Sequence, residues 1–157
     1  MVNKAGSLRH ALLWLFVPLV FTGGYVFAEK TGVPTPKEYG IYAKTIKGLK
    51  RIIPNIVLGQ GSMAYIESNN PQRFTLGEVQ YFVVYGTYQI QFLTLNNLLP
   101  LNQSAIGRPR FILGKEVATD VKKEGSSLYV VKPKGLFGRG YYAIWIINDA
   151  TWDFIVE

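Results

Sequence analysis

This chain of 157 residues has 17 basic and 10 acidic residues and a net charge of +7. It contains no cysteine, and its single histidine, His10, stands near the N-terminus. The rest of the chain therefore lacks the usual general base near neutral pH, the Ser-His and Cys-His nucleophile pairs, and the common ligands of zinc, copper, haem and iron–sulfur clusters. These absences argue against most catalytic classes, and we expect no metal and no cofactor.

Residues 1–28 have the order of an export signal. Lys4, Arg9 and His10 form a basic start, an apolar stretch follows, and Val26-Phe27-Ala28 stands before Glu29. This order predicts export to the periplasm, the cell surface or the extracellular space. The apolar run 11–28 is at the short end of what spans a bilayer as a helix, so retention as a membrane anchor is the alternative. Pro18 and the glycines at 23 and 24 favour cleavage.

Residues 29–38 are polar and contain two prolines, a composition that predicts an extended linker. From residue 39 to residue 157, short runs of Tyr, Ile, Val and Phe alternate with Gly, Pro and Asn, and no helical periodicity extends over ten residues. We predict an all-β domain over 39–157, an antiparallel β-sandwich with an immunoglobulin-like Greek key favoured over a barrel, preceded by the N-terminal hydrophobic signal or anchor helix. The expected strands are 39–45, 49–53, 62–67, 73–76, 79–85, 89–95, 111–113, 116–122, 127–132, 141–147 and 152–156.

Turn signals predict two hairpins. Residues 46–48 should join the first two strands, and Gly86-Thr87 should join strand 79–85 to strand 89–95. Farther along, Leu136 to Tyr141 fits L-x-x-G-x-Y within one position. This element resembles the tyrosine corner of immunoglobulin-like sandwiches, in which a Tyr hydroxyl bonds to an upstream backbone group. The resemblance implies a fold class and carries no function.

Carboxylates are the main catalytic groups that remain. A glycoside hydrolase needs two of them across a cleft, and the candidates lie on separate expected strands and turns. They are Glu67, Glu78, Glu116, Asp120, Glu124, Asp149 and Asp153. No pair is indicated by spacing, so we predict that the protein is not an enzyme and keep a carboxylate-based glycan hydrolase as a minor alternative.

The first expected hairpin combines basic and aromatic residues. Its candidate contact residues are Tyr39, Tyr42, Lys44, Lys47, Lys50 and Arg51. Basic groups interleaved with aromatic rings are typical of surfaces that read polyanions. Lysines along an edge strand also prevent pairing with neighbouring chains, and this second interpretation is favoured. An exported domain rarely meets nucleic acid, so an anionic envelope polymer or lipid headgroup is the ligand class that we expect here.

Residues 96–110 read as a long connection that is too apolar for a solvated loop. Its apolar candidates are Leu98, Leu99, Leu101 and Ile106. They are expected either to cap an open end of the sheet, which is favoured, or to dock on a partner.

Together these observations predict an exported, non-catalytic β-sandwich module with a structural, protein-binding or envelope-binding role. A protein partner or self-assembly is expected, and nucleic acid is not. The alternative is a membrane-anchored accessory subunit of a larger envelope complex, with membrane contact through residues 11–28 if these are not cleaved.

Overall fold

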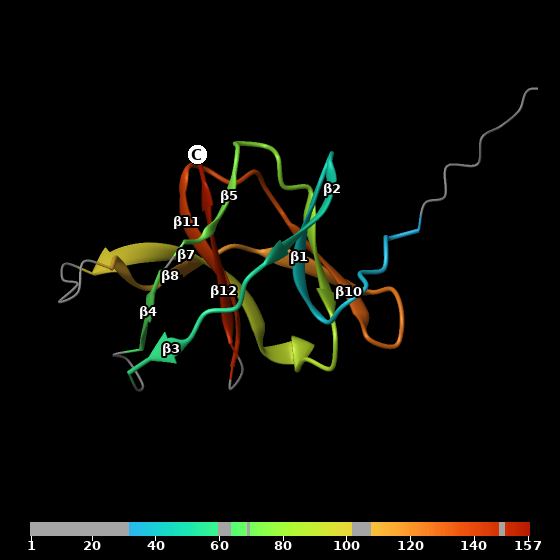
Figure 1. The fold of residues 1–157 in the computed structure, drawn as a ribbon, viewed down its shortest axis with the longest axis horizontal. Helices are drawn as coiled ribbons and strands as arrows, with labels where there is room; N and C mark the ends of the chain where they lie inside the picture. Colours follow the sequence, from blue (N-terminus) through green and yellow to red (C-terminus); the bar gives the residue numbers. More distant parts are fainter. Residues whose placement is uncertain (1–31, 60–63, 69, 102–107, 148–149) are drawn as a thin grey trace, which may run out of the picture. The chain divides into compact units, whose positions relative to one another are not determined.

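The computed structural model describes residues 32–59, 64–68, 70–101, 108–147 and 150–157 (Figure 1). The predicted signal or anchor, residues 1–28, lies outside the described residues, as do Ile106 and Asp149. Among the residues that are described, no helix is long and apolar enough to cross a membrane.

The described part of the chain is built from β-strands and one short 3-10 helix. The strands are β1 (Gly40–Thr45), β2 (Gly48–Ile52), β3 (Val57–Leu58), β4 (Tyr65–Glu67), β5 (Gln72–Phe74), β6 (Tyr81–Tyr85), β7 (Leu93–Leu101), β8 (Arg110–Glu116), β9 (Thr119–Lys123), β10 (Leu128–Pro133), β11 (Gly140–Ile146) and β12 (Thr151–Val156), and the 3-10 helix is η2 (Ile90–Phe92). This confirms the all-β class.

Two sheets form the fold, and neither is a closed barrel. The five-stranded sheet has the order β2-β1-β6-β10-β9, and the seven-stranded sheet has the order β3-β4-β8-β7-β11-β12-β5. All neighbouring strands run antiparallel except β12 and β5, which are parallel. The predicted first hairpin is confirmed, because Thr45 of β1 pairs with Gly48 of β2 across the turn.

The main core lies between the two sheets. Ile41, Phe82 and Val131 from the five-stranded sheet pack in one buried cluster with Leu95 and Ile144 from the seven-stranded sheet. The final strand contributes as its alternation predicts, since Trp152, Phe154 and Val156 are all buried in this cluster. Burial of apolar area on both inner faces is the main force that holds such a two-layer fold together.

A second cluster lies on the other face of the seven-stranded sheet. Ile66, Leu98, Phe111 and Ala143 are buried there. The connection between β2 and β3 reaches back to β12, where the Asn55 N–H donates to the Thr151 carbonyl at 2.6 Å. This bridge brings the β3–β4 edge toward β12, so that the sheet curls around the second cluster.

The second predicted hairpin is wrong. β6 pairs with β1 and β10 in the five-stranded sheet, whereas β7 pairs with β11 and β8 in the seven-stranded sheet. After Gly86 the chain therefore crosses from one sheet to the other through η2. The expected 96–110 connection is also shorter than predicted, because β7 continues to Leu101 and β8 begins at Arg110. β3 was not predicted, since it has only two residues.

Three Gly-x-Tyr elements share one local geometry. Gly40, Gly86 and Gly140 have φ angles of 152°, 146° and 149°, which favour glycine. A Cβ at each of these positions would meet the ring of the tyrosine two residues later, most closely at Gly86, where Tyr88 Cε2 would be 2.8 Å away. The aromatic ring thus covers the bare glycine backbone.

In two of these elements the tyrosine hydroxyl also donates a hydrogen bond to a backbone carbonyl four residues earlier. The Tyr142 hydroxyl donates to the Gly138 carbonyl at 3.1 Å, and the Tyr42 hydroxyl donates to the Glu38 carbonyl at 2.9 Å. Tyr142 therefore makes the kind of bond that the sequence suggested one position earlier, at Tyr141.

Candidate interaction surfaces

The basic hairpin places its predicted contact residues on two different faces. Tyr42 and Lys44 of β1 point outward from the five-stranded sheet, and Arg51 is paired with Tyr42 on the same face. Lys50 is paired with Ala43, whose side chain is buried in the core, so Lys50 leaves the hairpin on the inner side. The six residues grouped by sequence therefore do not form one continuous patch.

The aromatic residues of the hairpin differ in exposure. Tyr39 is exposed, and its ring meets Tyr85 edge-on at a centroid distance of 5.0 Å. Tyr42 is buried in a third cluster with Val83 and Leu128, against which Val33 of the predicted linker also packs. Of these two tyrosines, only Tyr39 has a ring that is exposed enough to contact a ligand.

Most cations of the hairpin already have partners. Arg51 Nη1 lies 2.5 Å from Glu38 Oε2, and the Lys44 ammonium donates to the Thr45 carbonyl at 2.8 Å. Lys47 is exposed in the turn. A polyanion would compete with these internal bonds, which is the behaviour expected of a charged edge strand.

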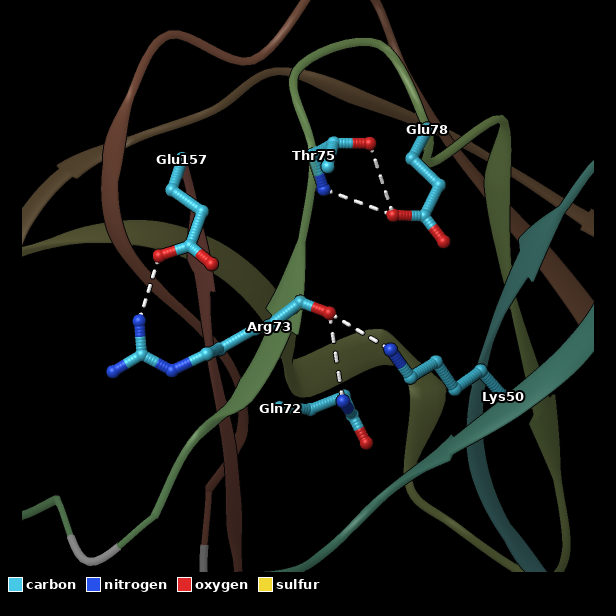
Figure 2. Close-up of polar contacts among 6 residues, drawn as sticks. All are labelled: Lys50, Gln72, Arg73, Thr75, Glu78 and Glu157. Carbon is cyan, nitrogen blue, oxygen red and sulfur yellow. Dashed lines mark hydrogen bonds and ion pairs between the residues drawn. The ribbon is translucent and has the colours of Figure 1, made fainter.

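Lys50 ties the hairpin to the other sheet (Figure 2). Its ammonium donates to the carbonyl oxygen of Arg73 in β5 at 2.8 Å and lies 4.9 Å from the centre of the Phe74 ring. The Arg73 guanidinium points the other way and forms an ion pair with Glu157 at 2.6 Å. Nothing in the sequence signals these contacts, because they join segments that meet only in the folded chain.

Glu78 lies beside Lys47 and Lys50. Its carboxylate accepts hydrogen bonds from the Thr75 backbone N–H at 2.9 Å and from the Thr75 hydroxyl at 3.2 Å (Figure 2). The backbone bond is the main reason that the pKa of Glu78 is lowered from 4.5. Partial burial opposes this shift, while the Thr75 hydroxyl and the charges of Lys50 and Lys47 add to it.

The predicted apolar residues of 96–110 fall on both faces of β7. Leu98 lies within β7 and is buried in the second cluster. Leu99 and Leu101 alternate with it and remain 46% and 40% exposed. The fourth candidate, Ile106, lies outside the described residues.

Two of the candidate carboxylates are held by partners from distant parts of the chain. Asp153 is buried and accepts hydrogen bonds from Ser68 Oγ and Asn55 Nδ2, and Glu67 is paired with Arg110 at 2.6 Å. Within the described ranges, no three His, Cys, Asp or Glu side chains are grouped so that they could hold a metal ion. Absence of catalysis stays a prediction.

We compared the chain with protein-family models, with curated proteins and with solved structures, and none of them matches it.

Proposed function

We propose that this chain is an exported, non-catalytic β-sandwich module that binds a protein partner, or a second copy of itself, through the exposed leucines of β7. The observation that carries this proposal is the exposure of Leu99 and Leu101 at the end of a strand whose earlier residues are buried or half-buried.

The alternation of β7 explains why these leucines are available. Leu93, Leu95, Leu99 and Leu101 lie on the same face of the strand, and the first two pack in the main core. In Figure 1, β7 and β8 extend away from β1, β2 and β10, so the five-stranded sheet does not cover their far end. Ile112, paired with Leu99, widens this apolar end. Apolar groups left at the uncovered end of an inner face favour a protein contact.

An immunoglobulin-like arrangement of the two sheets is part of the proposal. The Tyr142 hydroxyl that bonds back to the Gly138 carbonyl supports it, because tyrosine corners of such sandwiches make a bond of this kind. The export signal predicted over residues 1–28 supports a role in the cell envelope. Mass spectrometry of the mature protein separates a free module, which would begin at Glu29, from an anchored accessory subunit with an intact N-terminus.

Site-specific photocrosslinking in cells tests the contact surface. A photoreactive phenylalanine analogue at position 99 or 101 should give an adduct of defined mass, either with one partner or with a second copy of the chain. The matched control is position 46, since Ile46 is 79% exposed but stands in the β1–β2 turn. Adducts at all three positions alike, or at none, would contradict the proposal.

A further inference from the structure

The connection between β10 and β11 holds the most exposed large apolar side chain in the described part of the molecule. Leu136 is 94% exposed, although its neighbour Phe137 is buried. The Phe137 ring meets those of Tyr142 and Phe154 edge-on, at 4.9 Å and 5.6 Å between ring centres. On the other side of Leu136, the Lys134 N–H donates to the Ala118 carbonyl at 2.9 Å. The connection is therefore fixed on one side by the packing of Phe137 and on the other by the backbone hydrogen bond of Lys134, and Leu136 between them is exposed to solvent.

Cations flank this leucine. Lys132, Lys134 and Arg139 all lie within four positions of Leu136 in the sequence. Lys134 forms an exposed ion pair with Asp120 at 2.9 Å. Lys132 and Arg139 have no ion-pair partner among the residues that the structure describes.

A cleft of about 460 Å³ lies beside the connection, and the loop between β5 and β6 forms its other wall. Val79, Phe137 and Val156 give the cleft an apolar lining, and Lys132 and Lys134 stand at its cationic side. The acid of the opposite loop, Glu78, does not line the cleft; it lies with Lys47 and Lys50 in a neighbouring depression.

The opposite loop carries an exposed leucine of its own. Leu76 is 54% exposed. An apolar cleft with a protruding leucine on each flanking loop and a cationic side matches an amphiphile that has an anionic head.

We propose that the Lys132–Arg139 connection and the adjacent cleft dock this module on the surface of an anionic phospholipid bilayer. Leu136 enters the boundary between headgroups and acyl chains, and Lys132, Lys134 and Arg139 contact the phosphates. Apolar insertion and attraction of basic residues to anionic lipid are the two contributions by which peripheral proteins bind membranes. The surface is separate from the β7 leucines, so it does not depend on the protein contact proposed above.

The absence of cysteine in the chain allows a direct test. A single cysteine introduced as Leu136→Cys in the full chain is labelled with an environment-sensitive fluorophore and mixed with vesicles of phosphatidylcholine and phosphatidylglycerol, or of phosphatidylcholine alone. Ile46→Cys is the control, and because both proteins contain residues 1–31, any attachment through that segment is common to both. The label at 136 should shift to the blue with the anionic vesicles and be quenched by doxyl-labelled lipid, whereas the label at 46 should not.

Charge variants complete the experiment. Lys132→Gln with Arg139→Gln should raise the lipid concentration needed for half of the signal by about 25-fold, since each cation near an anionic surface contributes about fivefold. Lys115→Gln with Lys123→Gln removes the same charge elsewhere and should leave the signal unchanged. The proposal is overturned by an unshifted label at 136, by equal quenching at 46, by equal binding to neutral vesicles, or by an equal effect of the control pair. A shift that depends on protein concentration without lipid would instead assign the surface to a second copy of the chain.

Discussion

The Ser68 hydroxyl donates a hydrogen bond to Oδ2 of Asp153, although β8, β7 and β11 lie between β4, which Ser68 follows, and β12, which carries Asp153. The other carboxylate oxygen of Asp153 accepts from Asn55 Nδ2 at 3.2 Å. One buried carboxylate thus joins both segments that close the curl of the seven-stranded sheet.

Asp153→Ala should lower the free energy of unfolding by about 1–3 kcal/mol, because it leaves the buried Ser68 hydroxyl without its acceptor and removes one of the two acceptors of Asn55 Nδ2. Ser68→Ala should cost less, since Asp153 keeps its bond from Asn55. In urea unfolding, the double variant should be less destabilised than the sum of the two single variants. Strict additivity would mean that the two side chains do not act together.

Deletion of residues 152–157 should abolish cooperative folding. β12 lies between β11 and β5, and three of its side chains are in the main core. Burial of each contributes roughly 1.5–3 kcal/mol, which in sum is comparable with the whole margin of a small domain. Thermal unfolding followed by circular dichroism measures this. A truncated protein that melts cooperatively with native sheet content would contradict it. Removal of Glu157 alone is the control, since it costs the ion pair with Arg73 and two backbone hydrogen bonds but no core side chain.

Gly86→Ala should destabilise the fold by about 1–3 kcal/mol. The φ of 146° is unfavourable for alanine, and the new Cβ would lie 2.8 Å from the Tyr88 ring. Gly135→Ala is the matched control, since nothing lies within 4 Å of a Cβ there, and it should be neutral or slightly stabilising. Equal unfolding midpoints for the two variants would refute the role given to the Gly-x-Tyr element.

The stabilisation from Glu78 should depend on pH. Its pKa in the folded protein is below 4.5, so its contribution is fully present above pH 4.5 and is lost as the pH falls through the lowered value. Glu78→Gln should therefore melt at a lower temperature than the unmodified protein near neutral pH, with the difference shrinking in acid. A difference that stays constant down to acid pH would show that the charge of Glu78 is not the cause.

Lys50→Met should lower the free energy of unfolding by about 1 kcal/mol, because it removes the hydrogen bond to the Arg73 carbonyl while keeping an apolar stem over Phe74. Lys47→Met, in the adjacent turn, should leave stability nearly unchanged. Chemical denaturation of both variants checks the contrast, and similar losses would place Lys50 among ordinary surface charges.

Much of the strand pattern follows from local sequence, and β12 is the clearest case. Trp152, Phe154 and Val156 alternate with Asp153, Ile155 and Glu157, and this spacing predicts a strand with one apolar face without knowledge of its partner. The β1–β2 hairpin is equally local, since its two-residue turn fixes the register.

Which strands pair with each other is not decided by local sequence, and the predictions that depended on strand pairing were wrong. Gly86-Thr87 signals a change of direction, but the same signal serves a hairpin and a crossing between sheets. Residues 96–110 were predicted to form a connection, yet β7 continues through Pro100 to Leu101. Pro100 is tolerated there because β11 pairs with β7 only from Leu93 to Asn97. Beyond that point a residue without an N–H group costs less, since only β8 lies beside it.

The candidate surfaces, too, could be predicted only in part from the sequence. Basic and apolar residue types were identified from sequence, but which of them reach solvent depends on the fold. Lys50 was grouped with Lys44 and Lys47, and the pleat turns it inward toward β5. Leu136 stood in an expected turn with no sign that Phe137 alone would be buried.

The bridge from the β2–β3 connection to β12 also bears on how fast the domain folds. Asn55 and Asp153 are 98 positions apart, and Ser68 and Asp153 are 85 apart. Contacts of such long range are formed only after a large loss of chain entropy, which places a domain among the slower two-state folders. Until residues 151–156 are in place, β5 and the β2–β3 connection lack the strand with which they pair. During that interval, their open edges are the part of the chain that a chaperone or another unfolded chain would meet first.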